Sequence, residues 1–307
     1  MGAFFGFADK VAGKIRKLGF VRYNKIVGGR DANGLEYLGT RYGGWWLDTA
    51  MTNEITPSDV VISCGAGENL SFDLGLQKRT GCTVVIVDPT PRAVAHYAQL
   101  KNAAARGETI AINNGPGTYD AAGVDFSKLI LEPLAIWNRE ESLTLWFPVN
   151  PSHVSLSVMK NKNGQERITV PATTIAGLVK KYAISRLPLV KLDVENAEVT
   201  VVNDIIERGI RPRQLALEID ELNFPGAGTM ARVRDLTARL ADYSYVARHF
   251  DGEANFLFVD GRADPQIWRK RDNARRRVDP SFHPAYGRAK TASTHPDVER
   301  MPKRRAR

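Results

Sequence analysis

The sequence has few cysteines and no long apolar run, and these absences exclude several classes of protein. Only Cys64 and Cys82 occur among 307 residues, so neither a disulfide framework nor a zinc site built from cysteine pairs is expected. No apolar run approaches the roughly 18 residues of a membrane-spanning helix. The apolar start is interrupted at Asp9 and Lys10, too early for the apolar region of a signal peptide. We therefore expect a cytoplasmic protein with two buried, reduced thiols.

The net charge is unevenly distributed along the chain. There are 43 Lys and Arg against 34 Asp and Glu, which gives +9. Residues 262–307 hold 14 basic and five acidic residues, so they carry the whole excess and residues 1–261 are balanced. Hydrophobic periodicity also stops after Gly261, which is typical of a disordered tail. We expect weak contact of this tail with anionic surfaces and no specific binding of nucleic acid.

Apolar periodicity divides the chain into three regions. Residues 1–45 combine an amphipathic helix at 3–18 with an irregular, glycine-rich lead-in. That helix either packs on the core or lies on a membrane surface. Residues 46–260 form the folded domain, and 261–307 form the basic tail.

Short apolar runs alternate with amphipathic stretches across the folded domain. Strands are expected at 60–64, 82–87, 129–131, 143–147, 187–193 and 214–219, and helices at 69–80, 91–106, 173–186, 199–208 and 229–243. Thr90 and Thr229 are the expected N-caps of two of these helices. The runs 243–247 and 254–259 flank Asp251-Gly252, which indicates a hairpin. The pattern predicts an α/β fold with a mostly parallel sheet and a C-terminal antiparallel β-hairpin.

A glycine-rich motif directly follows the first of these strands. It reads Ser63-Cys64-Gly65-Ala66-Gly67-Glu68, and Asp88 ends the next strand 21 residues after Gly67. Glycines let a ligand approach the backbone closely, and a carboxylate at this distance can bind both hydroxyls of a ribose. We predict nucleoside binding by Ser63, Gly65, Ala66, Gly67, Glu68 and Asp88. The alternative is a tight turn with a capping aspartate.

The motif departs from the dinucleotide fingerprint GxGxxG. Leu70 stands where the third glycine belongs, so a close helix start facing a pyrophosphate is not specified. S-adenosylmethionine has no phosphates and does not need that glycine. The departure therefore disfavours an NAD(P)-dependent oxidoreductase, which remains an alternative.

Two carboxylates follow the strand expected at 187–193. Asp193 and Glu195 are two residues apart, and alternate residues of a strand point to the same side. They could position an acceptor hydroxyl, act as a base or bind a divalent cation, although no metal site is assigned. The structural alternative is an ion pair between Asp193 and Lys191. His153 is a further candidate base by residue type, although a lone histidine in a polar segment is more often only solvated.

Together these motifs resemble the FkbM family of methyltransferases over about residues 43–260. The resemblance is carried by Gly65–Asn69, Asp88–Pro91, Trp146–Pro148, Leu189–Glu195 and Gln214–Glu218. It implies a Rossmann-like class I methyltransferase that uses S-adenosylmethionine. It also implies a small-molecule or glycan acceptor, methylated on a hydroxyl of a sugar, glycan or secondary metabolite.

Two residues depart from the FkbM pattern. Asn69 stands where an aspartate is common, and Asn196 stands where the family has glycine. Asparagine tolerates positive φ, so we expect the turn after Glu195 to be kept. The departures leave open a non-catalytic, methyltransferase-like binding protein as another alternative.

Overall fold

The structure is a computed structural model that describes residues 33–113, 117–148, 156–158, 166–223 and 227–263. The helix expected at 3–18, His153 and nearly all of the basic tail lie outside these ranges. None of the described helices combines the length and apolar character needed to cross a membrane.

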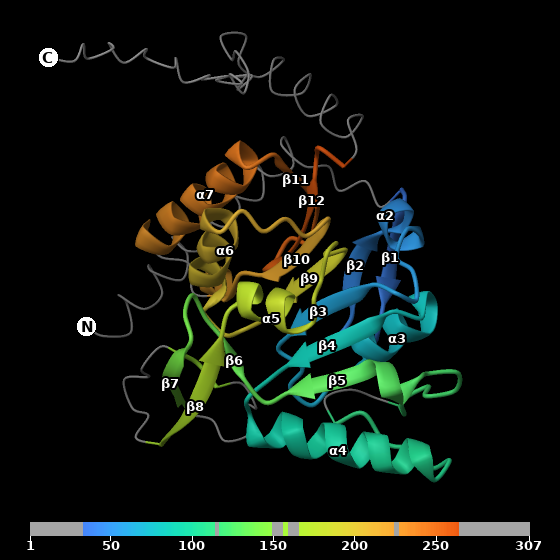
Figure 1. The fold of residues 1–307 in the computed structure, drawn as a ribbon. Helices are drawn as coiled ribbons and strands as arrows, with labels where there is room; N and C mark the ends of the chain where they lie inside the picture. Colours follow the sequence, from blue (N-terminus) through green and yellow to red (C-terminus); the bar gives the residue numbers. More distant parts are fainter. Residues whose placement is uncertain (1–32, 114–116, 149–155, 159–165, 224–226, 264–307) are drawn as a thin grey trace, which may run out of the picture.

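The domain is built on a seven-stranded sheet with the order β11-β12-β10-β9-β3-β4-β5 (Figure 1). Its strands are β3 (Val60–Cys64), β4 (Thr83–Val87), β5 (Leu129–Glu132), β9 (Leu189–Leu192), β10 (Gln214–Glu218), β11 (Tyr245–Phe250) and β12 (Asn255–Asp260). The five strands from β10 to β5 run parallel. β12 is antiparallel to both β10 and β11. The mixed α/β fold with a mostly parallel sheet is therefore confirmed.

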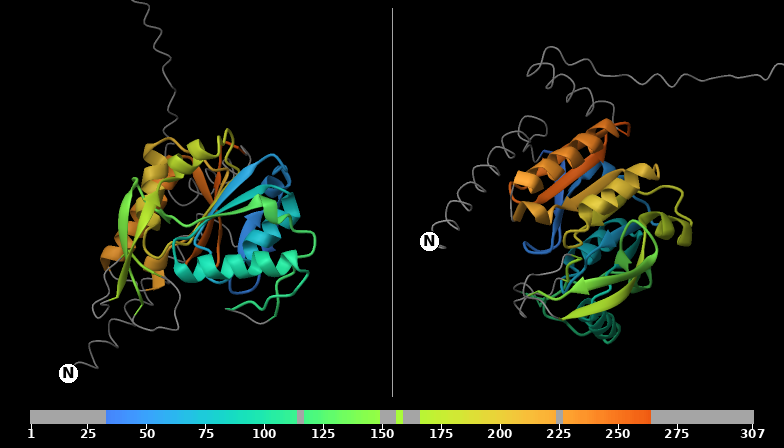
Figure 2. Two further views of the ribbon diagram at one scale, coloured as in Figure 1. Left: turned by 60° about the horizontal axis from the view of Figure 1, so that its bottom comes forward. Right: turned by 90° about the vertical axis from the view of Figure 1, so that its left-hand side faces the viewer.

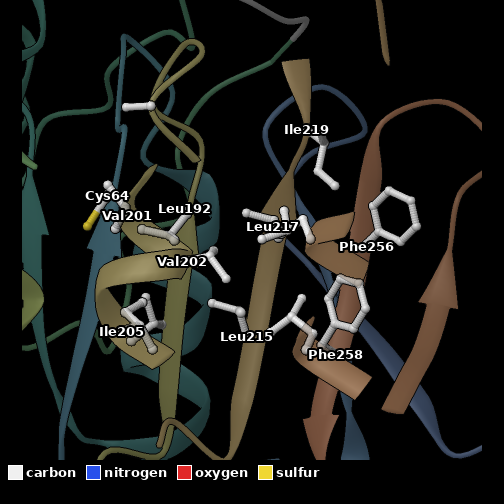
Figure 3. Packing of buried hydrophobic residues seen from close by; sticks show 14 of the residues in the cluster. Cys64, Leu192, Val201, Val202, Ile205, Leu215, Leu217, Ile219, Phe256 and Phe258 are labelled. Atoms are coloured by element: carbon white, nitrogen blue, oxygen red, sulfur yellow. The ribbon is translucent and has the colours of Figure 1, made fainter. Parts of the chain in front are cut away.

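Helices cover both faces of this sheet (Figures 1 and 2). They are α2 (Thr49–Asn53), α3 (Ser71–Thr80), α4 (Pro91–Ala105), α5 (Ile175–Lys181), α6 (Glu198–Glu207) and α7 (Ala227–Asp242), with short 3-10 turns η1 (Phe126–Lys128) and η2 (Asp220–Asn223). Strand alternation divides the apolar side chains into two cores. Leu215 and Leu217 of β10 pack with residues of α6 and α7, while Ala216 faces the α3 side. Figure 3 shows the first of these cores.

Local sequence signals, such as helix caps, predicted the positions of most of these elements correctly. Thr90 accepts a hydrogen bond from the Ala93 backbone N–H at 3.3 Å, with Pro91 as the first residue of α4. Gly81 ends α3 in the left-handed region. Thr229, however, is not an N-cap, because α7 begins two residues earlier at Ala227.

The lead-in is more ordered than its glycine content suggested. It contains the antiparallel pair β1 (Leu35–Leu38) and β2 (Trp45–Asp48). Glycines at 39, 43 and 44 lie in the turn between these strands. The prediction of an irregular segment is therefore wrong for residues 35–38 and for the start of β2 at Trp45.

A second, three-stranded sheet was missed as a unit. It has the order β6-β8-β7, with β6 (Ala135–Ile136), β7 (Glu141–Trp146) and β8 (Arg167–Thr173). Figures 1 and 2 show it beyond the ends of β3, β4 and β5, on the side toward which their arrows point. This small sheet is therefore placed to cover whatever lies at the carboxyl ends of the parallel strands.

Candidate active site

A cavity of about 310 Å³ lies at the carboxyl ends of the parallel strands. Its walls include Gly65, Ala66, Gly67, Glu68, Asp88, Asp193 and Glu195. Seven of the nine residues predicted for the site thus share one cavity. Ser63 does not line it, because it is buried within β3, and His153 lies outside the described residues.

Gly65 is required by the close approach of two strand ends. It has φ of +84°, and a Cβ added to it would lie 1.7 Å from the Asp193 carbonyl oxygen. The Gly65 N–H donates to Val87 O at 2.9 Å, and the Asp193 N–H donates to Cys64 O at 3.2 Å. The loop is therefore held between the ends of β4 and β9, where only glycine fits.

The Asp88 carboxylate accepts hydrogen bonds from the backbone of this loop. One oxygen accepts the N–H groups of Ala66 and Gly67, both at 2.9 Å. The other accepts the Thr90 N–H at 2.8 Å and the Thr90 hydroxyl at 2.6 Å. A carboxylate offers about four acceptor positions, and these bonds fill them. In the structure Asp88 therefore acts as a capping aspartate, which was the alternative to a ribose ligand. A contact between Asp88 and a ribose stays a prediction.

Glu68 and Asn69 tie the loop to neighbouring segments. Glu68 pairs with Arg92 of α4 at 2.5 Å. The Asn69 amide donates to the Thr40 hydroxyl at 3.0 Å, and its oxygen accepts the Ser71 N–H at 3.1 Å. At position 69, where the FkbM pattern commonly has an aspartate, this chain has an asparagine. Its side-chain amide binds the turn between β1 and β2.

The carboxylates after β9 reach the cavity by a different route from the one predicted. β9 ends at Leu192, and Glu195 and Asn196 both have positive φ, +53° and +76°. The argument from strand alternation is therefore wrong, since a left-handed turn places Glu195. The expectation that Asn196 keeps the turn is confirmed, and its N–H donates to the Asp220 carboxylate at 3.1 Å.

Lys191 is a buried cation beneath the loop. Its Nζ donates to the Gly65 carbonyl and to the Asp193 carboxylate, the latter at 3.1 Å. It also lies 5.3 Å from the centre of the Trp45 ring. Burial acts to lower the pKa of Lys191, but the nearby carboxylates of Asp193 and Asp73 outweigh it and raise the pKa. The predicted ion pair with Asp193 is thus present, and Asp193 still lines the cavity.

Glu218 is an acidic cavity residue that sequence reasoning missed. It ends β10 directly opposite Asn255 of β12, and both line the cavity. Burial, followed by the charges of Asp193 and Asp220, raises the pKa of Glu218 to about 8. The rule that selected Asp193, a carboxylate at the carboxyl end of a predicted strand, would have selected Glu218 as well.

Tyr42 is an exposed residue that lines the cavity. Its side chain is 72% exposed and lines the cavity from the turn between β1 and β2. The pKa of Tyr42 is raised, first by burial and then by Asp193, Glu195 and Glu218. Tyr42 thus lies near the carboxyl groups of Asp193, Glu195 and Glu218. No group of three or more His, Cys, Asp or Glu residues suited to a metal ion occurs within the described ranges.

The opposite wall of the cavity is apolar. It comes from the small sheet and its connections, with Ala135, Ile136, Leu143, Leu145, Leu156 and Val158. Segment 156–158 is held beside the acidic turn, because the Ser157 hydroxyl donates to Glu195 O at 3.0 Å. The site thus combines a glycine loop, a group of carboxylates and an apolar wall.

Comparison with known protein families gives a match over more than half of the chain. The methyltransferase FkbM domain matches residues 63–246. The search of curated proteins gave no match. Among solved structures, PH0793 from Pyrococcus horikoshii, provisionally described as a transferase, matches at 8% identity. That match covers 74% of this chain and 71% of the other, with a TM-score of 0.26.

Proposed function

Because this chain belongs to the FkbM methyltransferase family, we propose that it transfers a methyl group from S-adenosylmethionine to an acceptor hydroxyl. The proposed acceptor is a sugar, a glycan or a secondary metabolite. The observation that carries the proposal is the single cavity shared by the glycine loop and the carboxylates that follow β9 and β10. The parallel sheet with β11 and β12 at its edge is also typical of the Rossmann-like class I fold.

The residues of the cavity fit S-adenosylmethionine better than a dinucleotide. Gly65, Ala66 and Gly67 would contact the nucleoside, and the carboxylates of Asp193 and Glu195 suit a positive sulfonium. A pyrophosphate would instead meet carboxylates, and Leu70 is buried where a third glycine would open the helix start. These features disfavour a nicotinamide-dependent oxidoreductase.

The protein would contribute alignment, exclusion of water and removal of a proton. Bound S-adenosylmethionine supplies a methyl group that is already activated for transfer. The apolar wall of the small sheet would keep water from the reacting groups, and the carboxylates would orient the acceptor hydroxyl. Glu218, with a pKa of about 8, would accept the hydroxyl proton in its ionised form, whose share grows as the pH rises toward 8. Asp193, held by Lys191, would position the acceptor.

Transfer of a radiolabelled methyl group tests this function. The full chain would be incubated with labelled S-adenosylmethionine and a library of hydroxylated glycans and metabolites. We expect label in a product that survives mild alkali, because a methyl ether is stable there and a methyl ester is not. Label that alkali releases, or label found only on nitrogen, would contradict O-methylation of a hydroxyl.

The role of Asp193 is tested by Asp193→Asn, which keeps the shape of the side chain. Lys191 already binds one oxygen of Asp193, so the other is left to bind the acceptor. We therefore expect the variant to lose about one hydrogen bond to a charged group, which lowers turnover about 10- to 100-fold. Affinity for S-adenosylhomocysteine should stay within twofold. Asp204→Asn is the matched control, because Asp204 pairs with Arg208 at 2.7 Å outside the cavity. Normal turnover with a lowered melting temperature would show that Asp193 serves the ion pair alone.

The role of Asp88 is tested by Asp88→Ala. We expect it to weaken binding of S-adenosylhomocysteine by about 1.5–3 kcal/mol, measured by calorimetry, since the loop loses its charged acceptor. Asp125→Ala is the control, because Asp125 makes the same kind of cap to Ser127, with bonds of 3.0 and 2.6 Å. A folded Asp88→Ala protein that binds with the affinity of the parent would rule out Asp88 as a determinant of the nucleoside site.

A further inference from the structure

A second, smaller cavity adjoins the mouth of the candidate active site. It measures about 150 Å³ and is lined by Tyr37, Arg41, Tyr42, Trp46 and His249, among others. The two cavities adjoin, because both are lined by Tyr42, Gly44, Trp45 and Asn255. Its walls come from residues 37–46 and 249–257, which lie outside the matched family domain.

Neighbouring aromatic rings, tilted by 60° and 49° to one another, make up an aromatic wall of this second cavity. Tyr37 and Trp46 have ring centres 5.1 Å apart, and Trp46 and His249 are 5.2 Å apart. Tyr37 and Tyr42 are also the exposed large hydrophobic side chains of the described residues. Exposed aromatic surface gathered in a hollow commonly marks a binding site.

The turn that carries this wall is held in place before any ligand arrives. The Tyr37 hydroxyl donates to Thr40 O at 3.1 Å and to Arg41 O at 3.2 Å. The Gly44 N–H donates to Thr40 O at 2.7 Å. The Asn69 amide binds the Thr40 hydroxyl from the other side. A preorganised wall loses little conformational entropy on binding.

The polar groups around the rings select the class of ligand. Arg41 and Asp251 carry opposite charges on the walls of this cavity, so a phosphate-bearing ligand would meet Asp251. A cation would meet the positive charge of Arg41. Asp251 would not bind the cation, because its oxygens already accept hydrogen bonds from the N–H groups of its own turn and from the Asn255 amide. The Asn255 side-chain oxygen, in contrast, is buried and has no hydrogen-bond partner among the described residues. A neutral ligand with an apolar face and hydroxyl groups at its edge satisfies these conditions.

We propose that the aromatic cavity is a saccharide subsite that holds the sugar unit next to the one presented to the carboxylates. One apolar face of the sugar would stack on the aromatic wall, and its hydroxyls would reach Arg41 and Asn255. The aromatic cavity, at about 150 Å³, is about half as large as the candidate active site, so it would take a single sugar unit. Its link to methyl transfer rests on the proposed function, and it implies an acceptor of at least two sugar units.

Saturation-transfer NMR on the full chain tests the subsite. The probes are methyl glycosides of hexoses, deoxyhexoses and N-acetylhexosamines, together with their disaccharides, in the presence of S-adenosylhomocysteine. We expect saturation on both rings of at least one disaccharide and weaker binding of its monosaccharides. Tyr42→Ala and Arg41→Ala alter exposed side chains and should each weaken that disaccharide by about fivefold or more. The control is Tyr243→Ala, because the Tyr243 ring contacts Arg211 outside both cavities. This variant should bind the disaccharide as tightly as the parent.

Several outcomes would overturn the subsite. They are the absence of binding by every saccharide, equal binding by Tyr42→Ala and the parent, and preferential binding of adenosine monophosphate or choline. Calorimetry with S-adenosylhomocysteine on the same sample separates the two proposals. Cofactor binding without saccharide binding overturns the subsite alone. Saccharide binding without cofactor binding keeps the subsite and contradicts the proposed methyl transfer.

Discussion

Gly65→Ala is expected to reduce the affinity for S-adenosylhomocysteine at least about 100-fold. A Cβ at Gly65 would lie 1.7 Å from the Asp193 carbonyl oxygen, and φ of +84° disfavours alanine as well. The backbone must therefore shift at the point where β3, β4 and β9 end. That shift moves the Ala66 and Gly67 amides away from Asp88 and closes the cradle for the nucleoside.

Gly107→Ala provides the matched control. Gly107 also has positive φ, +69°, but a Cβ there would meet nothing within 4 Å. It carries the conformational cost of alanine in the left-handed region, about 1–2 kcal/mol, without a clash or a place in the cavity. Calorimetry on both variants, with melting temperatures measured in parallel, separates cofactor loss from instability. A folded Gly65→Ala protein with parental affinity would contradict the assignment of the loop.

Glu218→Gln is expected to lower turnover by about 10²–10⁴-fold, the usual range for loss of a general base, with cofactor affinity unchanged. Because the pKa of Glu218 is about 8, the parent should gain activity as pH rises toward 8 and beyond. The variant should lose this pH dependence. Glu132→Gln is the control, since Glu132 also ends a strand but binds Lys181 and Tyr182 outside the cavity. Loss of turnover without any change in the pH profile would contradict the assignment of Glu218 as the base.

The same residue predicts how stability varies with pH. Burial raises the pKa of Glu218 from an ordinary value of about 4.3 to about 8. Between these values the folded protein holds a proton that the unfolded chain has released, so Glu218 makes stability fall as pH rises. Glutamine has no proton to release. The melting temperature of Glu218→Gln relative to the parent should therefore increase from pH 5 to pH 9, and a constant difference would contradict the raised pKa.

The central sheet and the glycine loop could be predicted because their signals are local. Buried strands such as Val60–Cys64 and Thr83–Val87 are short apolar runs bounded by glycine or proline. The positions of Gly65 and Asp88 follow from the rule that ligands bind at the carboxyl ends of parallel strands. Asp88 shows the limit of that rule, since its place was correct but its bonding partners in the structure are backbone amides.

The small sheet and the acidic turn could not be predicted in the same way. Pro171 interrupts the pattern of β8 and has no N–H to donate, which argues against a strand. It is tolerated because β6 pairs only with Ala172 and Thr173, beyond the proline. Glu195 adopts a left-handed conformation that is uncommon for glutamate. Its contacts with distant segments are not encoded in nearby sequence, so the rule of strand alternation was wrongly extended to it beyond the end of the strand.

Isothermal titration calorimetry of the full chain with S-adenosylhomocysteine, and in parallel with NAD, tests the central claim most directly. The glycine loop, the carboxyl groups of the cavity and Leu70 in place of a third glycine predict saturable binding of S-adenosylhomocysteine and no binding of NAD. Tighter binding of NAD would indicate an oxidoreductase. Absence of binding by both would indicate a methyltransferase-like protein without catalysis, and either result would contradict the proposed function.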